Sequence, residues 1–84
     1  MYQNLIKNYV SKLTHNDIYN FALKQNIKLE DDELNIIYDY IKNDWRIIVF
    51  GNPENLFNDF KTKVNINTYN KAMELFQKYK NKIR

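Results

Sequence analysis

The chain has 84 residues, no Cys and a net charge of +3, and it contains one Gly and one Pro. Without Cys the sequence excludes disulfides, thiolate zinc sites and a Cys nucleophile, and it favours the cytoplasm as the compartment. Its longest apolar run, residues 47–50, is far shorter than the roughly 18 residues that a membrane helix needs, and residues 1–4 lack the features of a signal peptide. We therefore expect one cytoplasmic domain with no membrane segment.

Charge is distributed unevenly along the sequence. Residues 1–28 carry four Lys against one Asp, residues 29–60 carry eight acidic residues against one Lys and one Arg, and residues 61–84 carry seven basic residues against one Glu. The acidic middle and the basic end are the strongest electrostatic features of the chain, and they permit antiparallel association of two copies.

Apolar residues at intervals of three and four predict two helices in the first part of the chain. The spacing from Tyr2 to Leu13 predicts a helix over residues 2–12. Thr14 can then accept from amides of a following helix, Asp17 lies at its third position, and Leu13 can pack on Ile18, which together predict an N-cap. This second helix is expected over residues 15–25, and its buried side chains are expected to be Ile18, Tyr19, Phe21 and Ala22.

The segment after residue 25 ends one helix and begins another. Asn26 is expected in the left-handed conformation that follows a helix C-terminus, and residues 27–29 are expected to form a short extended link. The acids of residues 30–33 then precede a helix predicted over residues 31–44, where N-terminal amides favour negative charge. Its inward residues are expected to be Leu34, Ile37, Tyr38 and Ile41.

Residues 45–53 contain the only Trp, Gly and Pro of the chain. Residues 46–50 are rich in β-branched side chains, so a helix end, a connector and a strand are all open. Since no second strand exists to pair with them, we interpret them as a last turn or a buried connector. Gly51 is expected at positive φ, Asn52 as a cap, and Pro53 at the first position of a helix over residues 53–62. This stretch is therefore predicted to be a joint rather than a functional loop.

The last predicted helix covers residues 66–82, with Asn65 or Asn67 as its N-cap. The apolar side of this helix is formed by Tyr69, Ala72, Met73, Phe76 and Tyr79. Five helices without a strand predict an all-α protein, a compact single-domain bundle of about five short helices.

Several segments share a pattern with a known group of proteins. They are Lys12-Leu-Thr-His-Asn-Asp-Ile18, residues 22–27, Asp32-Glu-Leu34, Tyr40-Ile-Lys42, Asn52-Pro53 before Leu56-Phe57, and Thr68-Tyr-Asn-Lys71. Over about residues 12–80 the chain resembles small helical proteins of unknown function from Bacillus and Clostridium relatives. The resemblance implies a helical fold and a bacterial cytoplasmic location, and it brings no activity with it.

The sequence offers little for catalysis or metal binding. His15 is the only His and has no second imidazole or thiol to complete a transition-metal site, so we interpret it as a surface helix residue. The acids of residues 30–33 lack the alternating spacing and central Gly of a calcium loop. Hydroxyl groups besides those of Tyr are few, and a single Gly cannot form a phosphate-binding glycine loop. We therefore expect no enzyme activity, no metal and no cofactor.

A basic face near the end of the chain is the candidate contact for RNA or DNA. The side chains concerned are Lys61, Lys63, Lys71, Lys78 and Lys82. The last three fall within about 20° of one line at about 100° per residue. The competing interpretation is a solvated face, because Lys is favourable at a helix C-terminus, Glu74 can pair with Lys78, and the Tyr residues are expected to be buried. Weak nucleic-acid binding is therefore the alternative function.

Aromatic residues give the main functional prediction. Seven Tyr, five Phe and one Trp are more than a five-helix core of this size readily hides. The predicted contact residues are Tyr40, Trp45, Arg46 and Phe50, with Tyr2 also insecurely buried, because exposed aromatics beside an Arg are typical interface anchors. The interpretation left open beside it is that Trp45, Arg46 and Phe50 complete the core. We predict a protein-interaction module whose partner is another protein or itself.

Overall fold

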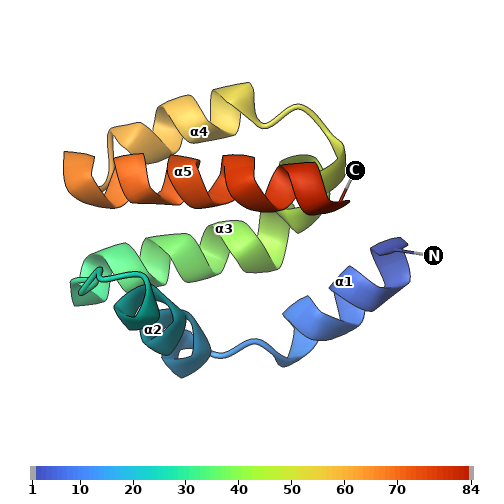
Figure 1. Cartoon of the computed structure of the whole chain (residues 1–84), viewed down its shortest axis with the longest axis horizontal. Helices are drawn as coiled ribbons and strands as arrows, with labels where there is room; N and C mark the ends of the chain where they lie inside the picture. The colour runs from blue at the N-terminus through green and yellow to red at the C-terminus, as the bar shows by residue number, and fades with distance from the viewer. Residues whose placement is uncertain (1, 84) are drawn as a thin grey trace. The chain divides into compact units, whose positions relative to one another are not determined.

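The computed structural model describes residues 2–83, and it describes the side chains of residues 3–81. Within residues 2–83 the chain forms five helices and no strand. α1 is Tyr2–Lys12, α2 is His15–Lys24, α3 is Asp31–Phe50, α4 is Glu54–Lys61 and α5 is Ile66–Ile83 (Figure 1). The predicted all-α class with five helices is confirmed.

The chain divides into two compact units, one ending at Asn52 and one beginning at Pro53. In the first unit α3 contacts both α1 and α2, and in the second unit α4 contacts α5. Figure 1 shows α4 and α5 side by side, and it shows α1 and α3 pointing in opposite directions. The single domain expected from the sequence stays a prediction.

Local hydrogen bonds fix both ends of α2. The Thr14 side chain accepts the Asp17 amide at 3.1 Å, and the Asp17 carboxylate accepts the Thr14 amide at 3.0 Å, so the predicted N-cap is confirmed. At the other end Asn26 has a φ of 66°, and the Ile27 amide donates to the Ala22 carbonyl at 2.9 Å. This is a Schellman motif, which confirms the left-handed conformation predicted for Asn26.

α3 is longer than the sequence predicted. It begins among the acids as expected, with the Glu33 carboxylate accepting the Glu30 amide at 3.2 Å. It then continues to Phe50, so the predicted end at residue 44 is wrong. Of the alternatives for residues 46–50, the helix end is confirmed. The buried connector is wrong, because Ile47 is 43% exposed and Phe50 is 38% exposed.

The extension of α3 has a simple physical reason. Ile and Val lower helix stability by less than about 0.7 kcal/mol each, and continued helical bonding outweighs this. The bonding extends to Gly51, whose amide donates to the Ile47 carbonyl at 3.0 Å. A helix therefore tolerates a β-branched run that, taken alone, has the composition of a strand.

The turn between α3 and α4 differs from the prediction in two respects. Gly51 has a φ of −106°, so the predicted positive φ is wrong. Glycine is favoured here because there is little room for a side chain: a Cβ atom at this position would lie 3.1 Å from the Ile47 Cα and 3.2 Å from the Ile47 carbonyl oxygen. Pro53 is the N-cap of α4 rather than its first residue, and its carbonyl accepts the Phe57 amide at 2.8 Å. Proline suits this position because no amide is needed there.

At the start of α5 the structure decides between two predicted caps. The Asn65 side-chain oxygen accepts the Thr68 amide at 2.9 Å, and the Asn65 carbonyl accepts the Tyr69 amide at 3.0 Å. Asn65 is therefore the cap, and Asn67 lies inside the helix.

The apolar residues buried among the described side chains are Val10, Ile18, Leu29, Trp45 and Phe60. Some predicted inward positions are exposed instead: Phe21 by 43%, Tyr79 by 40% and Tyr9 by 68%. The expectation that these aromatic side chains are buried is wrong. Helical spacing gathers apolar residues on one side of a helix, but one neighbouring helix covers only part of a wide stripe.

Candidate protein-interaction surface

The structure brings three of the four predicted contact residues together at the end of α3. The Arg46 guanidinium carbon lies 4.4 Å from the centre of the Trp45 ring, and the Phe50 ring meets the Trp45 ring edge-on at 6.4 Å. Tyr40 is half-buried and lies earlier on the same helix. The Tyr2 side chain lies outside the described residues.

Burial separates the roles of these residues. Trp45 is only 6% exposed, as expected if it completes the core rather than contacting a partner. Arg46 and Phe50 are exposed, and Ile47 beside them is also exposed. A partner at this end of α3 would therefore contact Arg46, Ile47 and Phe50 and leave Trp45 beneath them.

The most exposed large apolar side chains of the described chain lie on α1, where the sequence analysis placed no site. Leu5 is 63% exposed and Tyr9 is 68% exposed. Together with exposed Lys12 they lie within about 60° of one line on the helix, and we call these three residues the α1 edge. Val10, on the neighbouring side of the helix, is buried. The signal in the sequence was the width of the apolar stripe on residues 2–13, which is more than one packed helix covers.

A contact between helices holds the C-terminus of α1 on α3. The Lys42 ammonium donates to the Val10 carbonyl at 2.6 Å and to the Ser11 carbonyl at 3.1 Å. These are last-turn carbonyls that have no partner within the helix. The same ammonium lies 5.4 Å from the centre of the Tyr38 ring, on which His15 stacks at 3.7 Å. His15 is exposed, as predicted for a surface helix residue.

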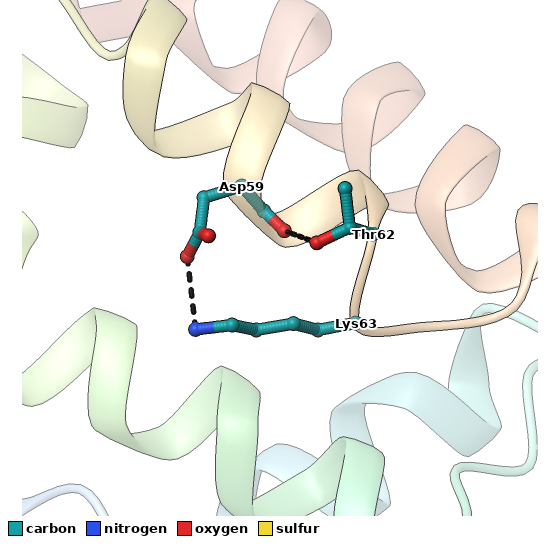
Figure 2. Close-up of polar contacts among 3 residues, drawn as sticks. All are labelled: Asp59, Thr62 and Lys63. Carbon is teal, nitrogen blue, oxygen red and sulfur yellow. Dashed lines mark hydrogen bonds and ion pairs between the residues drawn. The ribbon is translucent and has the colours of Figure 1, made fainter.

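The predicted nucleic-acid residues in and before α5 are partly engaged within their own unit. The Lys63 ammonium lies 2.9 Å from the Asp59 carboxylate, and the Thr62 hydroxyl donates to the Asp59 carbonyl at 2.7 Å (Figure 2). The Lys61 ammonium lies 5.5 Å from the centre of the Tyr69 ring.

On α5 itself the pairing differs from the sequence expectation. Lys71 lies 3.7 Å from Glu74, so Glu74 pairs toward the N-terminus of the helix rather than with Lys78. Lys78 is exposed. The Lys82 side chain lies outside the described residues. The predicted basic face therefore includes at least three lysines, Lys61, Lys63 and Lys71, that already contact a carboxylate or a ring.

Two other kinds of site are absent from the described residues. Over residues 2–83, no helix combines the length and the hydropathy that a bilayer span requires. Within the same range, no three side chains of His, Cys, Asp or Glu gather as a metal ion would require.

Comparisons with protein-family models, with curated proteins and with solved structures give no match to this chain. The resemblance to small helical bacterial proteins therefore stays a prediction.

Proposed function

We propose that this chain is a non-enzymatic protein-interaction module that works in the cytoplasm. The observation that supports this most is the α1 edge, where Leu5 and Tyr9 leave 63% and 68% of their surface in water. Contiguous exposed apolar surface beside polar groups is typical of protein contact sites. Covering such surface is favourable by about 25 cal/mol per Å² of apolar area.

A protein partner fits this surface better than a nucleic acid does. Tyr9 can serve as an aromatic anchor, since Tyr is enriched among the residues that dominate protein interfaces. Three of the five lysines proposed for RNA or DNA, Lys61, Lys63 and Lys71, have competing contacts in their own unit, as the Lys63 to Asp59 pair at 2.9 Å illustrates. Neutralising phosphates with these lysines would require giving up part of those contacts.

Site-specific photocrosslinking tests the proposal. Tyr9 is replaced by the photoreactive aromatic residue benzoylphenylalanine, and the full chain is irradiated in a native lysate with and without nuclease. The matched control carries the same group at Asn20, an exposed polar position on α2. We expect a protein adduct from position 9 that survives nuclease and is absent from position 20. Equal adducts from both positions, or an adduct that nuclease removes, would contradict the proposal.

A further inference from the structure

A second exposed edge in the first unit complements the α1 edge. Asp39, Asn43 and Ile47 lie on the exposed side of α3, and they fall within about 80° of one line on the helix. We call these three residues the α3 edge. Ile47 is 43% exposed, and Phe50 at 38% extends the apolar end of this edge. The α3 edge therefore runs from a carboxylate, through an amide, to exposed apolar side chains.

The two edges match residue by residue when the helices are antiparallel. Leu5 then lies opposite Ile47, Tyr9 opposite Asn43, and Lys12 opposite Asp39. From Leu5 to Lys12 the helix rises by seven steps, or about 10.5 Å, and from Asp39 to Ile47 it rises by eight steps, or about 12 Å. The flexible Lys side chain readily spans this small difference. Leu5 thus meets an apolar side chain, Tyr9 meets an amide, and the Lys12 cation meets a carboxylate.

We propose that a second copy of this chain covers the α1 edge with its own α3 edge, the two helices lying antiparallel. This rests on the proposed protein-binding function and names the partner. Charge favours that partner at one end of the contact, because Lys12, with no acid among residues 2–16, meets Asp39, while exposed Arg46 lies toward the other end, where α1 carries no charge on its exposed edge. Within one copy α1 already uses a different face for α3, the one with buried Val10 and the Lys42 contact. The α1 edge therefore stays open to the α3 of another copy.

The contact joins two different surfaces, so it is heterologous. Every copy offers one α1 edge and one α3 edge, and such contacts produce either closed rings or open chains. Association is expected to be weak and sensitive to salt, since a single pair of short helix edges buries little area and one of its contacts is an exposed ion pair.

Charge exchange between the two edges is the decisive experiment. Sedimentation velocity on the purified full chain, at concentrations up to about 1 mM, measures self-association in a range suited to small interfaces. We expect the average mass to rise with concentration. Lys12→Glu and Asp39→Lys should each weaken association by about tenfold, because each turns an attractive pair into a repulsive one. An equimolar mixture of the two variants should recover association, since each then supplies the charge that the other needs.

Control variants distinguish this contact from nonspecific association of exposed apolar side chains. Leu5→Ala with Tyr9→Ala should abolish the rise in mass, whereas Ile66→Ala, which truncates a side chain that is 55% exposed on α5, should leave it unchanged. Circular dichroism verifies that every variant keeps its helices. A chain that stays monomeric at about 1 mM, or variants whose mixture associates no better than either alone, would overturn the proposal. A monomeric chain whose position 9 still crosslinks a different protein in lysate would overturn self-association and leave the protein-binding function intact.

Discussion

Replacing Lys42 by Met removes the ammonium that joins α1 to α3 and keeps an unbranched side chain that is one atom shorter. The wild-type ammonium donates at 2.6 Å to the Val10 carbonyl and at 3.1 Å to the Ser11 carbonyl. A hydrogen bond to a charged group contributes about 1.5–3 kcal/mol, and a cation at a helix C-terminus adds about 0.3–1 kcal/mol. The Ser11 contact is exposed, and the Val10 carbonyl also accepts the Leu13 amide at 3.1 Å, so that carbonyl keeps a partner.

We therefore expect Lys42→Met to lower the free energy of unfolding by about 1–2 kcal/mol. For a chain of this length that loss lowers the melting temperature by about 4–15 °C. Hydrogen exchange should show the loss of protection concentrated in the amides of α1, because the removed contact holds that helix.

Urea unfolding followed by circular dichroism measures the change, and Lys7→Met, in the middle of α1, is the matched control. The control makes the same change in net charge on an exposed side chain of α1, and it should alter stability by no more than about 0.5 kcal/mol. If the two variants were equally stable, or if exchange rose equally in all helices, the reasoning about Lys42 would be refuted.

Further predictions concern the helix ends and the core. Asn65→Ala should destabilise the chain by about 1 kcal/mol by removing the cap on the Thr68 amide, whereas Asn67→Ala should have little effect; thermal melts of both variants test this. Asn26→Gly should preserve stability and Asn26→Ala should lower it by about 1 kcal/mol, since a φ of 66° suits glycine; equal melting temperatures would contradict the left-handed turn. Trp45, 6% exposed, should resist iodide quenching, and quenching as strong as that of free tryptophan would show that its indole is accessible.

Features that depend on neighbouring residues were predictable from the sequence. The cap formed by Thr14 and Asp17 involves residues three apart, and the left-handed turn at Asn26 needs only the residues around it. The acids at the start of α3 are recognisable for the same reason. Local chemistry determines these helix ends, so periodicity and capping residues suffice to locate them.

Features that depend on distant residues were not predictable. Lys42 contacts the Val10 carbonyl across 32 positions in the sequence, and no local pattern indicates that pairing. The width of the apolar stripe on α1 indicates that part of it stays exposed, but which residues are exposed, Leu5 and Tyr9, depends on where α3 packs, and periodicity alone cannot give that. The role of Gly51 was also missed, because its close approach to the Ile47 backbone is visible only in three dimensions.

The arrangement of contacts in the first unit has a consequence for how the chain opens. α3 contacts both α1 and α2, and it ends at Phe50, before the second unit begins. Elements that share most of their contacts tend to unfold together as one cooperative group. α1 and α2 each depend on α3 for their packing, so a fluctuation that unwinds α3 exposes the amides of all three helices at once.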